Sequence, residues 1–439
     1  MGDKYAASSL VSNEDDSLTS VQLNKLQPML EAVLQNNHFY REKLHKAGIR
    51  VAQDIQSIDD FRRLPFTLKS ELSQDQAKNP PYGTNLTFPL AHYIRIHQTS
   101  GTTGEPLKML DTAESWDWWA KCWTSVYRAA GVTAEDRIFF AFSFGPFIGF
   151  WSAFAGAQKL GALAISGGGM SSRQRAKAIE NHRATVLVCT PTYALHLAEV
   201  AQEDGIDTAN TSIRITIQAG EPGASLPAVK RRIEQAWGAR CYDHAGSTEV
   251  GAWGFEREGT QGLQLNDDEF IFEVIDPETG ASAQDGELVI TNLGRIGLPV
   301  IRYRTGDRVK MQSIMGADGH VQHWLDGGVI GRIDDLLVVR GINVFPSAIE
   351  NIVRKFPEVG EFAVDVYRKN ELDEIEMRLE IKGPMLQEVA AAVAETIHNK
   401  LSLRVNTMPV AFGSLPLFNH KARRFTDHRK DDGLFSGAA

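Results

Sequence analysis

The chain has 439 residues, which is too long for one ordinary hydrophobic core and predicts two or three domains. Its composition, with 43% hydrophobic and 23% charged residues, is typical of a soluble globular protein and excludes a fibrous or disordered one. With 46 basic and 55 acidic residues the net charge is −9, which disfavours a surface that wraps nucleic acid.

The cysteines and the N-terminus narrow the class further. Cys122, Cys189 and Cys241 are scattered without CxxC spacing, which fits a reducing compartment and supports neither a disulfide scaffold nor a thiolate zinc site. Residues 1–17 are polar and acidic, unlike a secretory signal, and no apolar run reaches the roughly 20 residues that span a bilayer. We therefore expect a cytoplasmic protein with no membrane or nucleic-acid partner.

Helical and β patterns alternate along the first half of the chain. Apolar residues at helical spacing predict one helix over residues 18–47, and residues 93–97 predict a strand that runs into the loop QTSGTTGEP. Short apolar strands then alternate with helices, an order that predicts a mostly parallel sheet covered by helices. The expected strands are 137–142, 185–189 and 213–219, and the expected helices include 173–182 and 226–237.

The pattern changes twice towards the C-terminus. Residues 270–291 combine β-branched residues with turn signals, which predicts a β-rich subdomain at about 265–330. Beyond Gly331 the predicted order is strand, helix, strand, strand, helix (336–339, 347–355, 361–367, 376–381 and 386–399). The predicted fold class is α/β, with a polar tail (1–17), a large N-terminal body with mostly parallel sheets (18–331) and a small C-terminal α+β domain (332–439).

A loop rich in glycine and hydroxyl residues follows the first predicted strand. Glycines let backbone N–H groups approach an anion closely, and hydroxyls add uncharged donors. No GK[ST] sequence ends the loop, so it is not a Walker loop, and a plain surface turn is the alternative. The residues of this candidate phosphate loop are Thr99, Ser100, Gly101, Thr102, Thr103 and Gly104.

Two later segments favour the phosphate site over a surface turn. In YDHAGSTE, the hydroxyl of Thr248 beside the carboxylate of Glu249 suits a place where a phosphate meets magnesium, with a helix cap as the alternative. In YRTGD, the carboxylate of Asp307 can accept from both hydroxyls of a ribose, with a turn residue as the alternative. Arg332 is the second residue of the GRIDD segment, with a solvated surface charge as the alternative.

The order of these segments resembles the adenylate-forming superfamily of acyl-CoA synthetases, and within it the phenylacetate-CoA ligase family. The resemblance runs from about Leu18 to Asp427. The segments that carry it are NNHFYREKL, FRRLPFTLKSEL, RIHQTSGTTGEP, GALAISGGG, VCTPTYALHLAE, AGEP, YRTGD, GRIDDLLVVRGINVFPSAIE and LPLFNHKARRFTD.

The resemblance implies an ATP site, position by position. The loop Thr99–Gly104 would hold the β- and γ-phosphates, Thr248 would contact the α-phosphate, and Glu249 would bind Mg²⁺. Asp307 would take the ribose hydroxyls, with Arg332 beside them. The remaining implied nucleotide contacts are Gly220, Glu221, Pro222, Asp243 and His244.

The resemblance also implies parts that act when domains move. Asp334 falls at the hinge, Gly341 where the pantetheine arm of coenzyme A passes, and Lys421, in HKARRF, at the adenylation lysine. A lysine on a mobile domain can neutralise charge while a carboxylate attacks the α-phosphorus, and can then be withdrawn so that a thiol uses the same pocket. The catalytic set is therefore expected to be Lys421, Thr248 and Glu249.

Several residues depart from the family pattern. Glu105 stands where a lysine is common, and either Lys108 substitutes for it or Glu105 points to solvent. Ala245 replaces an aromatic residue, so His244 or Tyr242 supplies the face against the adenine, or the pocket is wider. His320 and His323 are spaced like metal ligands, but no cysteines accompany them, and we expect a solvated turn pair and no zinc.

The acid pocket is expected to have an aromatic lining that suits a flat apolar acid. For each phenylalanine the alternative is an ordinary core residue, and His97 is either a substrate or pantetheine contact or a satisfied buried histidine. The expected lining residues are Phe142, Phe144, Phe147, Gly167, Gly168 and Ala245.

The function that the resemblance implies is ATP-dependent activation of an aryl or arylacetic acid, followed by transfer to coenzyme A. The expected cofactors are ATP, Mg²⁺ and coenzyme A, and the partners are small molecules, with a homodimer left open. One alternative is an adenylating enzyme that passes its acyl-AMP to a carrier protein or an amine. Another is a catalytically weak nucleotide-binding protein, for which a mobile Lys421 would be superfluous.

Overall fold

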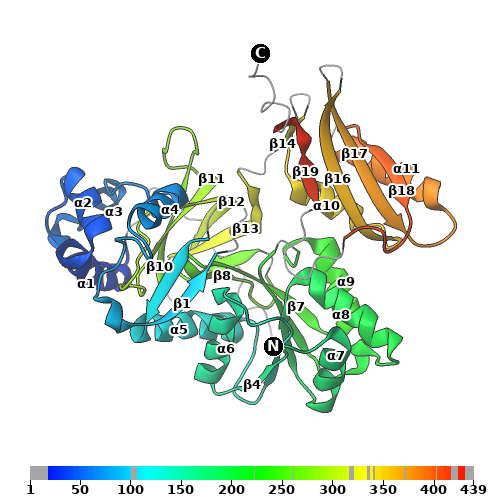
Figure 1. Ribbon diagram of the computed structural model, residues 1–439, viewed down its shortest axis with the longest axis horizontal. Helices are drawn as coiled ribbons and strands as arrows, with labels where there is room; N and C mark the ends of the chain where they lie inside the picture. The colour runs from blue at the N-terminus through cyan, green and yellow to red at the C-terminus, as the bar shows by residue number, and fades with distance from the viewer. Residues whose placement is uncertain are drawn as a thin grey trace.

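One eleven-stranded mixed sheet runs through the large body of the protein, and a small C-terminal domain lies beside it (Figure 1). The computed structural model describes residues 18–99, 106–221, 223–260, 262–315, 321–333, 337–339, 342–369, 372–401, 403–416 and 424–430. The strand order in the large sheet is β10-β11-β12-β13-β9-β8-β7-β6-β5-β3-β4. The α/β fold class is thus confirmed, with a sheet that is parallel at one end and antiparallel at the other.

The parallel end lies where short apolar strands alternate with helices. Its strands are β3 (Arg137–Phe140), β4 (Leu163–Ser166), β5 (Val186–Cys189), β6 (Ile215–Gln218) and β7 (Arg240–Ser247). Side chains of a strand alternate between faces, so Ile138 and Phe140 join one core while Phe139 joins the other. Helices α5 (Ala113–Ala129) and α6 (Ile148–Leu160) pack in the first core. The second core holds α7 (Ser172–Asn181), α8 (Pro191–Glu203) and α9 (Pro227–Trp237).

The antiparallel end continues the same sheet without helices between its strands. Its strands are β8 (Gly251–Phe255), β9 (Leu263–Leu265), β10 (Phe270–Ile275), β11 (Asp285–Asn292), β12 (Tyr303–Met315) and β13 (Val321–Arg332). The pairing of β12 with β13 sets Asp307 opposite Arg332. Two motifs that are distant in the sequence therefore become neighbours.

The N-terminal segment forms two helices where the sequence predicted one. α1 (Ser20–Asn36) ends at Asn37, whose side chain accepts a hydrogen bond from the backbone N–H of Tyr40, at 3.0 Å, and so begins α2 (His38–Lys46). Asn37 is fully buried, and its amide nitrogen also donates to Asn85 and Thr87. The prediction of a continuous helix over 18–47 is wrong because helical periodicity persists across a capping residue that tertiary contacts select.

Further helices connect this segment to the main sheet. α3 (Ile58–Arg62) and α4 (Lys69–Lys78) precede a two-stranded ribbon of β1 (Tyr93–Gln98) and β2 (Lys108–Thr112). Helices α1, α2 and α3 lie beside β10, at the left end of the molecule in Figure 1. Leu26, Leu30 and Phe61 share a core there with Ile271 and Ile301.

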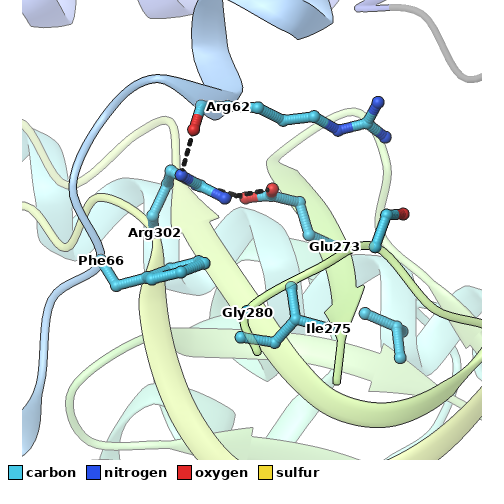
Figure 2. Close-up of a pocket in the computed structure, with 8 residues that line it drawn as sticks. Arg62, Phe66, Glu273, Ile275, Gly280 and Arg302 are labelled. Atoms are coloured by element: carbon cyan, nitrogen blue, oxygen red, sulfur yellow. Dashed lines mark hydrogen bonds and ion pairs between the residues drawn. The ribbon is translucent and has the colours of Figure 1, made fainter. Parts of the chain in front are cut away.

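A cavity of about 160 Å³ lies between α3 and the β10–β11 hairpin (Figure 2). Its wall includes the ion pair of Arg302 with Glu273, with nitrogen–oxygen distances of 2.9 and 2.8 Å. The Arg302 guanidinium also donates to the backbone oxygens of Arg62 and Leu64 and lies over the ring of Phe66. These contacts join the N-terminal helices to the sheet, so the cavity belongs to a structural joint.

The small C-terminal domain has a core of its own. A four-stranded sheet has the order β18-β17-β16-β19, and a separate pair is formed by β14 and β15. The elements are β14 (Leu337–Val339), β15 (Ile342–Val344), α10 (Pro346–Val353), β16 (Val359–Lys369), β17 (Leu372–Ile381), α11 (Leu386–Leu401), β18 (Asn406–Val410) and β19 (Phe425–Asp427). Figure 1 places this domain above α8 and α9. Within the part of the chain that the structure describes, no helix is both long and apolar enough to cross a bilayer.

Candidate active site

The predicted site residues converge on the carboxyl edge of the parallel strands. Phe142 and Phe144 follow β3, Gly167 and Gly168 follow β4, Gly220 and Glu221 follow β6, and Asp243, His244 and Ala245 lie near the end of β7. Because β7, β6, β5, β3 and β4 are consecutive in the sheet, these segments share one edge. This is the edge at which open α/β sheets bind their ligands.

The candidate phosphate loop begins at the same edge. The hydroxyl of Thr99 accepts a hydrogen bond from the N–H of Leu107, and the N–H of Thr99 donates to the Leu107 oxygen, both at 3.0 Å. One residue earlier, the N–H of Gln98 donates to the oxygen of Pro146 at 2.8 Å, which ties β1 to the aromatic segment 142–150. The structure therefore brings the start of the loop against the predicted acid pocket, while residues 100–105 lie outside the described part of the chain.

Glu249 lies just after β7, and its carboxylate is almost completely buried. Lys69, the first residue of α4, places its Nζ 3.0 Å from Oε1 of Glu249, and the hydroxyl of Tyr303 is 3.5 Å from the same oxygen. The buried carboxylate of Glu249 thus already has a positive charge beside it, the partly exposed ammonium of Lys69. These oxygen donors suit a hard cation such as Mg²⁺.

The side chain of Arg295 fixes the backbone of Thr248 and Glu249 through hydrogen bonds. The Arg295 guanidinium is fully buried and donates to the oxygen of Thr248 at 2.8 Å and to that of Glu249 at 3.3 Å. Its Nε and Nη2 form a bidentate pair with Asp111, both at 2.8 Å. Neither residue was singled out from the sequence, because 184 positions separate them and no local pattern links them.

We predict that Arg295→Met lowers the free energy of unfolding by about 3 to 5 kcal/mol, because it leaves the buried carboxylate of Asp111 without its partner. Chemical denaturation measures this loss. The matched control is Arg173→Met, which removes an exposed arginine from its ion pair with Asp204, a carboxylate that Lys177 also neutralises, and is expected to cost less than about 1 kcal/mol. Equal losses in the two variants would contradict the assigned role of Arg295.

Asp307 and Arg332 meet as the strand pairing requires. Nη1 of Arg332 lies 3.2 Å from Oδ1 of Asp307 and 2.6 Å from the oxygen of Thr305. Arg332 is thus an ion-pair partner at the edge of the site, with a side chain that remains exposed. The half-buried position of Asp307 is compatible with a ribose contact, which stays a prediction.

Asp243 and His244 occupy opposite faces of β7 near its end. Oδ1 of Asp243 accepts from the N–H of His244 at 3.0 Å, and Glu256 accepts from the N–H of Asp243 at 3.0 Å. Burial and the neighbouring Glu256 raise the pKa of Asp243 to about 7. Lys230 forms an ion pair with Glu256 and offsets part of this negative charge.

The aromatic segment after β3 forms a compact cluster. The rings of Phe142 and Phe150 are stacked with centroids 3.6 Å apart, and Phe144 lies 4.9 Å from Phe142. A Cβ on Gly168 would lie 2.7 Å from the Phe144 ring, so only glycine fits against it. Phe147 is 44% exposed, unlike the ordinary core residue that was its alternative. Phe142 and Phe144 are half-buried, as the lining of a pocket requires.

His97 is buried, and the structure bears on only one of the two roles considered for it, so a substrate or pantetheine contact stays a prediction. Its ring stacks on Trp116 with centroids 5.3 Å apart, and its Nδ1 is buried without a hydrogen-bond partner among the described residues. The closest charged group is Asp111, at 4.0 Å. Burial lowers the pKa of His97 to about 4, so the ring stays neutral. The prediction of a fully satisfied histidine is therefore wrong.

The C-terminal domain reaches the same edge of the sheet through Arg424. Its guanidinium pairs with Glu361 at 2.7 and 3.0 Å and with Glu350 at 3.1 Å, and its Nη2 lies 3.4 Å from the hydroxyl of Thr192 in α8. The N–H of Thr192 in turn donates to Glu221 at 2.8 Å. Arg424, which the sequence analysis did not select, thus connects the C-terminal segment to the AGEP loop.

Several predicted residues lie outside the described part of the chain, so their roles stay predictions. These residues are Ser100, Gly101, Thr102, Thr103, Gly104, Glu105, Pro222, Asp334, Gly341 and Lys421.

Comparisons with known proteins agree with this arrangement. Residues 33–294 match the family described as AMP-binding enzyme, and residues 341–429 match its C-terminal domain. The phenylacetate-coenzyme A ligase of Escherichia coli is 32% identical over 94% of this chain and 95% of its own length. The chain belongs to the phenylacetate-coenzyme A ligase family of AMP-binding enzymes.

Solved structures of a related ligase resemble this chain to different degrees. A 2-hydroxyisobutyryl-CoA ligase with 2-HIB-AMP, in its postadenylation state, is 30% identical, with a TM-score of 0.87 over 93% of this chain and 89% of that one. The ligase in its thioesterification state, with 2-HIB-AMP and CoA, is also 30% identical but has a TM-score of 0.69 over 94% and 91%. The two comparisons have nearly equal identity and coverage, so the lower TM-score reflects a different placement of the domains. The domain arrangement of this chain therefore resembles that of the postadenylation state.

The expected histidine pair of the β12–β13 hairpin needs a correction. His323 lies in β13, with its Nδ1 2.6 Å from Oδ1 of Asp267 and its N–H donating to Oδ2 at 2.9 Å. It is therefore a half-buried strand residue with a carboxylate partner, and not a solvated turn residue. His320 lies outside the described residues, and the expectation of no zinc stays a prediction.

Proposed function

We propose that this chain activates an aryl or arylacetic acid with ATP and then passes the acyl group to coenzyme A. The end-to-end match to a phenylacetate-coenzyme A ligase and the likeness to an acid–CoA ligase in two catalytic states support this function. The observation that carries it is the contact of Arg424 with Thr192. Lys421 is three residues before Arg424 in the sequence, and we propose that it serves the same site.

In the first half-reaction, an oxygen of the substrate carboxylate attacks the α-phosphorus and pyrophosphate leaves. The phosphate loop from Thr99 to Gly104 would bind the departing phosphates, and Thr248 would donate to the α-phosphate. Glu249 would hold Mg²⁺, which neutralises phosphate charge when bound. Lys421 would donate to the negative charge that develops in the transition state.

Nucleoside recognition completes the adenylation site. Asp307 would accept hydrogen bonds from the ribose hydroxyls, with Arg332 fixing its carboxylate. Gly220 and Glu221 would lie against the adenine, since the Glu221 side chain is held by the N–H of Thr192. The ion pair of Lys69 with Glu249 would open as ATP brings its own magnesium.

In the second half-reaction, the sulfur of coenzyme A attacks the acyl carbon, loses its proton, and AMP leaves. The lysine must first withdraw, because the thiol needs the same approach to the acyl group. We propose that the small domain rotates about Asp334 between residues 331 and 337 and that Gly341 then lines the path of the pantetheine arm.

Acid-dependent exchange of pyrophosphate into ATP, measured across a panel of aryl acids with and without coenzyme A, tests the function. Exchange together with a CoA thioester is the expected result. Exchange without thioester formation would favour an enzyme that delivers acyl-AMP to a carrier protein or an amine. The absence of exchange with every acid would leave only nucleotide binding.

We predict that Asp334→Pro retains adenylation while thioester formation falls by about tenfold or more. Proline fixes φ near −65° and removes an N–H, so it restricts a rotation that a hinge must permit. Adenylation should survive because the arrangement seen here is already close to the postadenylation one. Each half-reaction is assayed separately, with Asp334→Ala as the control for the lost carboxylate. A folded proline variant that loses neither half-reaction would exclude this pivot.

A cytoplasmic location and a homodimer are further parts of the proposal. Cell fractionation tests the location, and light scattering of the purified protein tests the dimer.

A further inference from the structure

The side chain of His244 has a fixed tautomer. Its Nδ1 lies 2.9 Å from the oxygen of Gly254 in the neighbouring strand β8. A carbonyl oxygen can only accept, so the proton must be on Nδ1. Burial lowers the pKa of His244 to about 4, which keeps the imidazole neutral at physiological pH. The other nitrogen, Nε2, therefore carries a lone pair and is a hydrogen-bond acceptor.

The ring is also fixed in position. It packs against Trp123 of α5 with centroids 4.3 Å apart, and the indole N–H of Trp123 donates to the hydroxyl of Ser152 in α6 at 2.9 Å. His244 is more than nine-tenths buried. The imidazole therefore has little freedom to seek another partner.

Nε2 is the edge of this ring that stays open. It makes no hydrogen bond to any residue in the described ranges, and, unlike Nδ1 of His97, it is not sealed from solvent. A Cβ on Gly246 would lie 3.1 Å from Nε2, so any larger residue would crowd the acceptor. Glycine at this position keeps the approach to Nε2 clear.

The acceptor lies on the face of the sheet that the acid pocket uses. Trp123 and Phe140 belong to the core on the α5–α6 side, and Phe142 and Phe144 pack against it. His244 contacts Trp123 and is on that side, whereas Asp243, next in the strand, points to the opposite face. The open nitrogen is thus on the side of the sheet where the aromatic residues of the acid pocket pack, and not on the α7–α9 side.

We propose that Nε2 of His244 accepts a hydrogen bond from the acid substrate, so that the preferred acids carry a hydroxyl or N–H group in addition to the carboxylate. This inference rests on the proposed function and deepens it. An ionised carboxylate has no hydrogen-bond donor. An acid with no other donor would displace water from Nε2 and leave this buried acceptor unpaired. Sites built to bond a substrate hydroxyl discriminate strongly against analogues that lack it.

The test compares acids of matched shape in pyrophosphate exchange. The panel holds phenylacetate, its three ring-hydroxylated isomers, the corresponding methoxy compounds, and the α-hydroxy and α-methoxy forms. We expect at least one hydroxy acid to exceed both its methoxy partner and phenylacetate by about tenfold or more in kcat/KM. A methoxy group can accept but not donate, so this ratio isolates the hydrogen bond.

His244→Phe keeps a flat ring but removes the acceptor, and it should reduce the hydroxy-to-methoxy ratio to about 1, since a tenfold preference corresponds to one hydrogen bond. His244→Gln retains an acceptor oxygen and should preserve part of the ratio, which guards against a phenylalanine variant that fails to fold. A wild-type enzyme that never prefers a hydroxy acid would overturn the inference, as would a folded His244→Phe variant with an unchanged ratio. If none of the acids supported pyrophosphate exchange, the result would instead contradict the proposed function.

Discussion

Lys421→Ala is expected to lower acyl-AMP formation by about a hundred- to a thousand-fold, because one donor that stabilises transition-state charge is lost. The same variant should convert supplied acyl-AMP to thioester at a normal rate, since the lysine is withdrawn during that step. Pyrophosphate exchange measures the first reaction, and CoA thioester formation from synthetic acyl-AMP measures the second.

The neighbouring arginine supplies the control. Arg423→Ala removes a positive charge from the same segment, two residues away, and should leave exchange near the wild-type level. Arg424 is unsuitable as a control because its guanidinium holds Glu350, Glu361 and Thr192 together. Normal adenylation in the Lys421 variant would remove the assignment of the lysine.

Glu249→Gln is expected to weaken the use of Mg·ATP by on the order of a hundred-fold, because it removes charge from a metal ligand at constant size. The side chain is buried, but its partner Lys69 is partly exposed, so the ammonium can be solvated and the fold should persist. The dependence of exchange on magnesium concentration is the measurement, with circular dichroism as the check on folding.

Glu273→Gln is the matched control for this second variant. Glu273 is as buried as Glu249 and also pairs with a cation, Arg302, but it lies at the structural joint of Figure 2. This control should lose stability and keep its magnesium dependence. A Glu249 variant with normal activity at low magnesium would show that another group holds the metal.

The family and the broad fold could be predicted from the sequence because both depend on local patterns. Short apolar strands such as 186–189 are recognisable by hydrophobicity alone, and the motifs at Thr248 and Asp307 are contiguous. The α/β class, the C-terminal α+β domain and the ATP-dependent ligase family therefore needed no tertiary information. Where a local signal persisted across a boundary, as at Asn37, the prediction of one continuous helix was wrong.

The tertiary structure alone decided which distant residues meet. Asp111 and Arg295, or Lys69 and Glu249, are separated by more than a hundred positions, and a charged residue carries no local sign of its partner. His323 of β13 pairs in the same way with Asp267, in the turn between β9 and β10. An ion pair or hydrogen bond acts over about 3 Å in space and is independent of distance along the chain. Hydrophobic periodicity repeats within a few residues, so the sequence specified the elements of this protein, and packing specified the electrostatics of its site.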